Sequence, residues 1–155
     1  MFDKIILFFK SQDWQYHIVG GESTAIFTIN GKNGSFRCLA DVQEDNKVFI
    51  FYSICNFNCP QEQLQVIAEL ITKLNYNRIF GNFELDYSDG EVRYKTSAYY
   101  STSILEDEVI ENVIMNNVVS MDTALKGLLT AMLSKVEVDR IVAEIEKILL
   151  PSETE

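Results

Sequence analysis

The sequence predicts an α+β fold with one antiparallel β-sheet and helices packed on it. The expected order is one helix, four strands, one helix, two strands and one or two helices. Three observations predict this fold. Apolar residues recur with a helical period near both ends of the chain, they alternate with a period of two in between, and Gly-rich or Asp-rich turn signals separate the alternating runs.

Composition limits the possible functions. The chain has 155 residues, 47% of them hydrophobic, and a formal net charge of −10, which together indicate one compact acidic domain. Such a charge repels nucleic acid and anionic membranes, so neither is an expected partner. An odd set of cysteines (Cys38, Cys55 and Cys59) fits a reducing compartment and predicts a cytoplasmic protein. No apolar run approaches the ~20 residues of a membrane span.

The first elements follow from their apolar periods. Residues 1–12 predict a core-facing helix, because Phe2, Ile5, Ile6 and Phe9 recur at helical spacing. From Tyr16 the period changes to two, and two alternating strands flank the Gly31–Gly34 turn. The apolar positions of these two strands are Ala25, Phe27, Ile29, Phe36, Cys38, Ala40 and Val42.

The next strand and helix frame the middle of the chain. Lys47–Ile54 is apolar on both strand faces, so we expect it in the middle of the sheet with both faces covered. Pro60 then opens a helix. The apolar stripe of that helix is Leu64, Ile67, Ala68, Ile71 and Leu74.

A hairpin around Ser88-Asp89-Gly90 is the most readable element. If Asp89-Gly90 forms a two-residue type I′ loop, the register follows by counting outward from it. One face of the hairpin is then apolar and the other carries two matched ion pairs, so we expect these pairs on the exposed face. The opposed residues are Tyr87 with Val92, Asp86 with Arg93, Leu85 with Tyr94, and Glu84 with Lys95.

The C-terminal part is expected to be helical. Ser103 and Glu106 have capping-box spacing, and no proline interrupts residues 106–150, which predicts one, two or three helices. This tract has more apolar surface than a small sheet needs, so we expect a homodimer. The residues expected at its self-association surface are Leu128, Leu129, Met132, Val136, Val142 and Ile145. We divide the chain into an α+β domain, residues 1–134, and a helical extension with a frayed tail, residues 135–155.

No residue pattern identifies a catalytic, cofactor-binding or metal site. Cys55 and Cys59 form a C-x3-C pair at a helix start, but zinc needs about four ligands, and Cys38 and His17 are the only other soft candidates. His17 has no nucleophile motif at recognisable spacing. The Gly31–Gly34 turn joins two strands, whereas a phosphate loop leads from a strand into a helix. We therefore expect no cofactor and no metal.

The segment Leu74–Tyr100 resembles the YbjN-domain proteins, which are described as bacterial sensory transduction regulators. The pattern is a helix ending in Leu-Asn, an aromatic or aliphatic turn, G-x-F-x-L-D, an Asp/Gly turn and E-V-R-Y. Here these residues are Leu74-Asn75, Gly81, Phe83, Leu85-Asp86, Asp89-Gly90 and Glu91-Val92-Arg93-Tyr94. The resemblance extends upstream to the opening helix with Trp14 and downstream to about Leu133. It implies a fold like the type III secretion chaperones, and it carries over no catalytic residue.

The expected function is that of a non-enzymatic cytoplasmic adaptor or regulator that binds another protein. The alternative is a small-ligand sensor whose sheet-and-helix pocket holds a metabolite, and a hydrolase using His17 is a more distant third. A sheet edge or the groove beside an amphipathic helix is a common site for peptide binding. We therefore expect the unidentified protein partner to bind at one of these two places.

Overall fold

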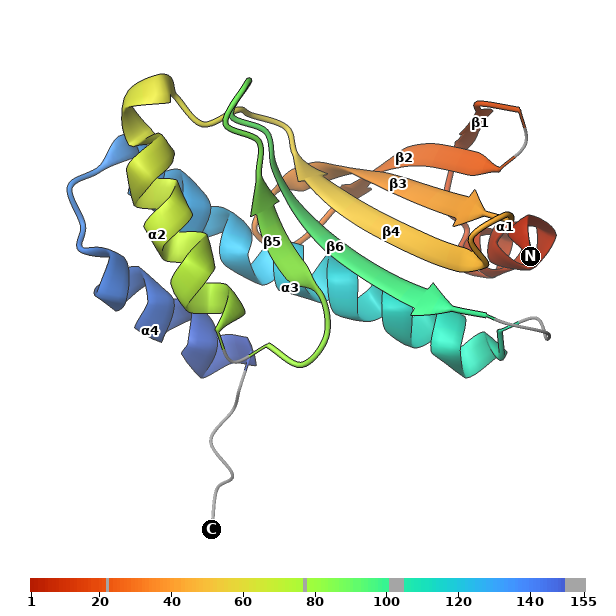
Figure 1. Cartoon of the computed structure of the whole chain (residues 1–155). Helices are drawn as coiled ribbons and strands as arrows, with labels where there is room; N and C mark the ends of the chain where they lie inside the picture. Colours follow the sequence, from red (N-terminus) through yellow and green to blue (C-terminus); the bar gives the residue numbers. More distant parts are fainter. Residues whose placement is uncertain (22, 77, 101–104, 150–155) are drawn as a thin grey trace, which may run out of the picture.

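The computed structural model describes residues 1–21, 23–76, 78–100 and 105–149. These residues form one six-stranded antiparallel sheet in the order β1-β2-β3-β4-β6-β5 (Figure 1). The strands are β1 (His17–Val19), β2 (Thr24–Asn30), β3 (Ser35–Gln43), β4 (Val48–Cys55), β5 (Asn82–Leu85) and β6 (Val92–Tyr99). The helices are α1 (Phe2–Ser11), the short 3-10 turn η1 (Gln61–Gln63), α2 (Leu64–Asn75), α3 (Asp107–Leu133) and α4 (Val138–Leu149). This succession confirms the predicted α+β class and element order.

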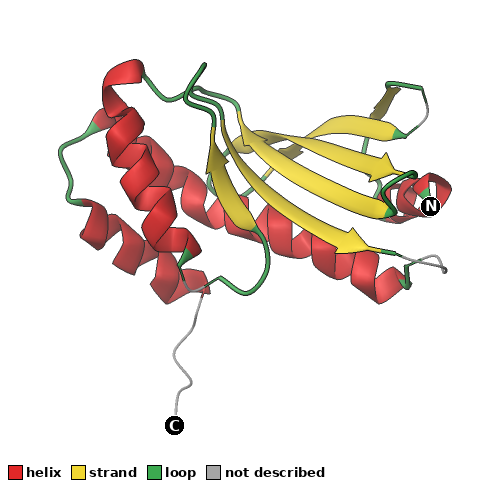
Figure 2. Ribbon diagram, in the orientation of Figure 1, coloured by secondary structure: helices red, strands yellow, loops and turns green. Residues whose placement is uncertain are grey.

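The α-helices of the described residues lie on one face of the sheet, which leaves the other face open (Figure 2). The longest helix, α3, runs beneath the central strands, where the Thr96 hydroxyl donates to the Val113 carbonyl at 2.8 Å. α1 covers the β2 end, and its Phe9 ring lies 4.8 Å from the Phe27 ring. The core therefore fills the space between the covered face and the helices.

β4 shows both a confirmed and a wrong prediction. It lies between β3 and β6, as its apolar sequence predicts. The expectation that both of its faces are covered is wrong, because Phe49 and Phe51 are fully buried while Ile50 and Tyr52 on the open face are only half-buried. Side chains of neighbouring strands give the open face its partial cover. The Arg93 guanidinium, for example, lies 4.7 Å from the centre of the Tyr52 ring.

The predicted hairpin register is wrong by two residues. Leu85, instead of Tyr87, opposes Val92, and Glu84 opposes Arg93. The physical reason is a longer loop, closed by the Asp86 backbone: its N–H donates to the Glu91 carbonyl at 2.9 Å and its carbonyl accepts from Gly90 at 2.8 Å. A shift of two preserves the strand faces, so Glu84 still meets Lys95 on the open face.

The predicted register paired Asp86 with Arg93. In the structure Asp86 forms no ion pair with Arg93, and its carboxylate turns into the loop. Its carboxylate accepts from the Ser88 N–H at 2.8 Å and from the Ser88 hydroxyl at 2.6 Å. These bonds hold the pKa of Asp86 below its usual value. Leu85, on the apolar face of the hairpin, is half-buried.

The C-terminal tract forms two helices, α3 and α4, separated by residues 134–137. Glu106 is the N-cap of α3 and not the third helical residue that a capping box requires; its expected partner Ser103, like the expected frayed tail, lies outside the described residues. α4 folds back against α3 at Gly127, where an added Cβ would lie 2.6 Å from Ile145 Cδ1. None of the helices in the described residues combines the length and the apolar character that a membrane span needs.

Candidate binding surface

The predicted self-association residues are largely used inside the chain. α4 covers the end of α3, and its Asp139 carboxylate lies 2.6 Å from the Lys73 ammonium of α2. Part of the apolar surface assigned to a dimer is thus covered by the chain's own helices, and self-association stays a prediction. Of the six residues, Leu128, Met132 and Ile145 are buried, and Leu129, Val136 and Val142 are half-buried.

The three thiols lie in surroundings that suppress their reactivity. Cys38, Cys55 and Cys59 are free and buried. Burial raises the pKa of Cys38 and of Cys55 to about 12, and it raises the pKa of Cys59 as well. A thiol reacts and binds metal as the thiolate, so these three side chains act as small apolar groups at neutral pH. Among the described residues no cluster of three or more His, Cys, Asp or Glu side chains is arranged to hold a metal ion.

The Gly31–Gly34 turn is occupied by the chain's own carboxylate. The backbone N–H groups of Lys32 and Asn33 donate to the Asp122 carboxylate of α3 at 3.1 and 2.9 Å. A Cβ on Gly31 would lie 2.2 Å from Asp122 Oδ1, so glycine makes room for this contact. The turn that offers amides to an anion therefore anchors β2 and β3 to α3.

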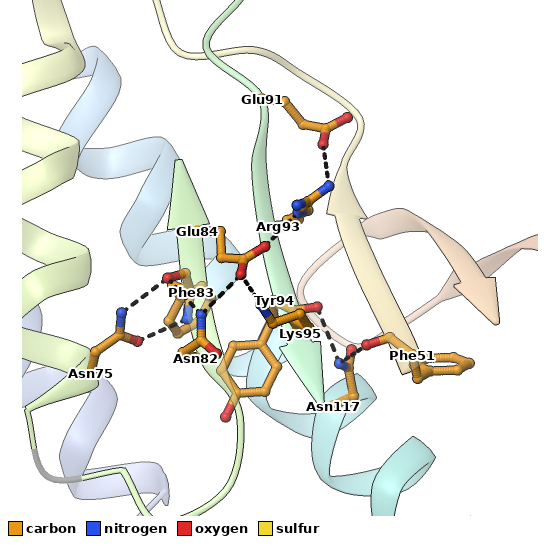
Figure 3. Close-up of polar contacts among 10 residues, drawn as sticks. All are labelled: Phe51, Asn75, Asn82, Phe83, Glu84, Glu91, Arg93, Tyr94, Lys95 and Asn117. Atoms are coloured by element: carbon orange, nitrogen blue, oxygen red, sulfur yellow. Dashed lines mark hydrogen bonds and ion pairs between the residues drawn. The ribbon is translucent and has the colours of Figure 1, made fainter. Parts of the chain in front are cut away.

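The outer edge of β5 is covered by Asn75, the last residue of α2 (Figure 3). The Phe83 N–H donates to Asn75 Oδ1 at 2.8 Å, and Asn75 Nδ2 donates to the Phe83 carbonyl at 3.0 Å. The Asn75 side-chain amide thus makes the two hydrogen bonds that a neighbouring strand would otherwise make with the backbone of Phe83. An added peptide strand would have to displace it, so this sheet edge, one of the predicted contact surfaces, is blocked at Phe83.

Glu84 organises the polar end of the open face (Figure 3). Its carboxylate lies 2.7 Å from Arg93 Nε and also contacts the Lys95 ammonium. Burial alone would raise the pKa of Glu84, but the hydrogen bonds from Lys95 and Arg93 outweigh it and lower that pKa. Arg93 also lies 3.6 Å from Glu91. These charges satisfy one another, which favours a structural over a catalytic role.

Asn117 locks α3 to the centre of the sheet (Figure 3). Its fully buried side chain donates from Nδ2 to the Phe51 carbonyl at 2.8 Å and to the Tyr94 carbonyl at 3.1 Å. Nδ2 also lies 3.0 Å from the Thr96 hydroxyl. Buried amides need such partners, so Asn117 fixes the position of α3 against β4 and β6.

The loop between α2 and β5 is the most exposed apolar segment of the described chain. Ile79 is 92% exposed, Tyr76 is 87% exposed and Phe80 is 68% exposed. We call these three side chains the apolar loop. Large apolar side chains that stand together in solvent mark interaction sites. The sequence pattern identified this segment only as an aromatic or aliphatic turn. The available signal was three large apolar residues within a short connection bounded by Asn75 and Gly81.

Arg78 anchors the apolar loop to the body of the protein. Its guanidinium carbon lies 5.2 Å from the ring centres of both Phe83 and Tyr94. Its Nη1 donates to the Tyr94 hydroxyl at 3.3 Å and to the Ser120 hydroxyl of α3 at 3.2 Å. Arg78 thus joins the loop to β5, β6 and α3 at once.

Two further contacts fix the loop backbone. The Tyr94 hydroxyl donates to the Phe80 carbonyl at 2.5 Å. Gly81 has a φ of +70°, and a Cβ there would lie 2.7 Å from the Lys95 carbonyl, so only glycine allows the chain to turn this close to β6. Because the backbone is held from both sides, the exposure of Ile79 and Phe80 is imposed by the fold.

Fold and surface together define a small α+β domain that presents an anchored apolar loop and an open sheet face. The chain belongs to the YbjN family: the family model described as "Putative bacterial sensory transduction regulator" matches residues 2–143. A similar solved structure is "Crystal structure of YbjN, a putative transcription regulator from E. coli", with a TM-score of 0.52 and 9% identity over 77% of this chain and 90% of that chain. At this identity the likeness shows a shared fold. No curated protein matches the chain.

Proposed function

We propose that this protein is a non-enzymatic cytoplasmic regulator that binds another protein in a stoichiometric complex, with the apolar loop as the central contact. The description of the YbjN family as regulators supports the general role. The observation that carries the proposal is the exposure of Ile79, Tyr76 and Phe80 on a loop whose backbone is held in place. Three free buried cysteines fit a reducing compartment.

Anchoring makes the apolar loop an efficient contact. A flexible loop loses conformational entropy when it binds, and a loop already held by Arg78 and Tyr94 avoids most of that loss. Burying one large apolar side chain contributes about 1.5–3 kcal/mol. Ile79 and Phe80 together therefore account for about 3–6 kcal/mol, or roughly a hundredfold or more in affinity.

Charge restricts the kind of partner. The chain carries a net charge of −10, so its field attracts basic segments and repels acidic ones. We expect a partner with an apolar groove for the loop and a neutral or basic surface around it. Raised salt should slow the association of such a pair, because screening removes the long-range attraction.

Retention on immobilised protein tests this proposal. The full chain, the double variant Ile79→Ser/Phe80→Ser and the control Leu133→Ser are exposed to a lysate of the source organism, and the retained proteins are quantified by mass spectrometry. Leu133 is a matched control because it is 79% exposed and lies at the end of α3, away from the loop in sequence. Circular dichroism verifies that the three proteins have the same fold.

The expected result is one protein retained at near-equal stoichiometry by the wild type and by Leu133→Ser, and lost from the double variant. Identical retained proteins at identical levels from all three would contradict the proposal. A small molecule that co-purifies with the wild type, seen by native mass spectrometry without a retained protein, would favour the metabolite-sensor alternative instead.

A further inference from the structure

The open face of the sheet carries a continuous apolar band. The strand register places Ile26, Leu39 and Tyr52 directly opposite one another across β2, β3 and β4. Ile50 lies beside this row on β4, and a third row pairs Val48 with Tyr99 of β6. Directly opposed side chains on one face lie ~5 Å apart, so these residues form one surface rather than isolated spots.

The open face is less acidic than the chain as a whole. Its formal charges are those of Arg37, Arg93 and Lys95 against Asp41, Glu84 and Glu91, a net charge of zero. The whole chain carries −10, so all of this net charge lies outside the open face. Two copies of the chain repel each other when they approach with their acidic surfaces, and this repulsion is smallest when they approach with their open faces.

We propose that a second copy of this chain packs on the open face, sheet against sheet, in a symmetric dimer. Two sheets stack about 10 Å apart by interleaving the side chains of their inner faces, and an apolar band on each face is what such packing requires. The proposal does not rest on the proposed function, because the apolar loop lies outside the open face.

The area of the face fits a reversible dimer. Six strands spaced ~4.8 Å apart and about 6.5 residues long on average, at ~3.3 Å per residue, cover roughly 600–650 Å². Two such faces bury about 1,200–1,300 Å² in total, the lower end of the range for specific interfaces. Interfaces of this size are typical of weak and transient complexes, so we expect a dimer that dissociates on dilution.

Sedimentation velocity across a concentration series tests the proposal. The proteins are the full chain and the variants Ile50→Lys and Ile26→Lys, which each insert a charge into the apolar band. Ile50 opposes Asp41, which can pair with the new ammonium and preserve the fold. The matched control is Val119→Lys on α3, which inserts the same charge at a half-exposed position on the helical side. The double variant Ile79→Ser/Phe80→Ser separates this surface from the apolar loop.

The wild type, Val119→Lys and the loop variant should dimerise with the same constant, and Ile50→Lys should dimerise at least tenfold more weakly. Raised salt should strengthen the wild-type dimer, because screening reduces repulsion between two chains of charge −10. A wild type that stays monomeric up to about 500 µM would overturn the proposal. It would equally be overturned if both sheet variants, with native circular dichroism, associated as tightly as the wild type.

Discussion

Replacement of Asn75 by alanine should destabilise the protein and expose the β5 edge. The substitution removes two hydrogen bonds, one from the Phe83 N–H at 2.8 Å and one to the Phe83 carbonyl at 3.0 Å. Each neutral hydrogen bond contributes about 1 kcal/mol net, so the expected loss in the free energy of unfolding is about 2 kcal/mol. Asn75 is half-buried, and water that reaches the freed groups can reduce this loss to about 1 kcal/mol.

Urea unfolding followed by circular dichroism measures this loss. The control is Asn112→Ala, which removes the same side chain from an exposed position on α3 and should cost less than about 0.5 kcal/mol. Asn75→Asp keeps the acceptor but turns a carboxylate toward the Phe83 carbonyl. It should therefore be at least as destabilising as Asn75→Ala at pH 7, and should recover below about pH 4, when the acid is protonated and can donate.

A second measurement follows the uncovered edge itself. An unpaired strand edge promotes association between sheets, so static light scattering should rise for Asn75→Ala and stay flat for Asn112→Ala. The reasoning is refuted if Asn75→Ala and Asn112→Ala unfold at the same urea concentration and scatter light equally. The two hydrogen bonds of Asn75 would then neither stabilise the protein nor protect the β5 edge from association.

Four further outcomes are expected. Glu84→Gln should lower the free energy of unfolding by about 1 kcal/mol at pH 7. Because the pKa of Glu84 is lowered in the folded protein, the extra stability of the wild type is present above the unfolded pKa. This extra stability should vanish as the pH falls through the lower folded pKa. Gly127→Leu should detach α4, since even a Cβ there lies 2.6 Å from Ile145 Cδ1; limited proteolysis should then cut between α3 and α4, and cutting no faster than in wild type would contradict this. Arg78→Lys should keep the global stability within about 1 kcal/mol but speed amide hydrogen exchange in the apolar loop, and unchanged exchange would show that the stack is not the anchor. With their pKa raised to about 12, the thiols of Cys38 and Cys55 should resist alkylation at pH 8 until the protein unfolds, and rapid labelling of the native protein would show that they are accessible.

Periodicity and turn signals predicted the fold class, the element order and the central place of β4. They failed where the side chains of a loop decide the geometry. Asp86 binds Ser88 inside the loop, so the loop of the β5–β6 hairpin is longer than two residues and the register moves by two. The predicted register assumed a two-residue loop at Asp89-Gly90, and the sequence does not indicate the bond between Asp86 and Ser88.

The candidate surface was less accessible to sequence reasoning than the fold. An apolar residue predicts burial, and for Leu128, Met132 and Ile145 that burial is within the chain itself. Ile79 and Phe80 have the same chemistry but stand in solvent, because Arg78 and Tyr94 hold their backbone from positions that only the folded chain brings together. The open face escaped notice for a related reason, since β4 is apolar on both sides while helices cover only one.

Site-specific photo-crosslinking inside the source organism tests the binding role of the apolar loop most directly. A photoreactive residue is placed at position 79 in one variant and at position 133 in another, both strongly exposed in the wild type. The proposed function predicts one discrete crosslinked product from position 79, of the mass of this chain plus one other protein, and none from position 133. Equal crosslinking from both positions, or no product from position 79, would contradict it.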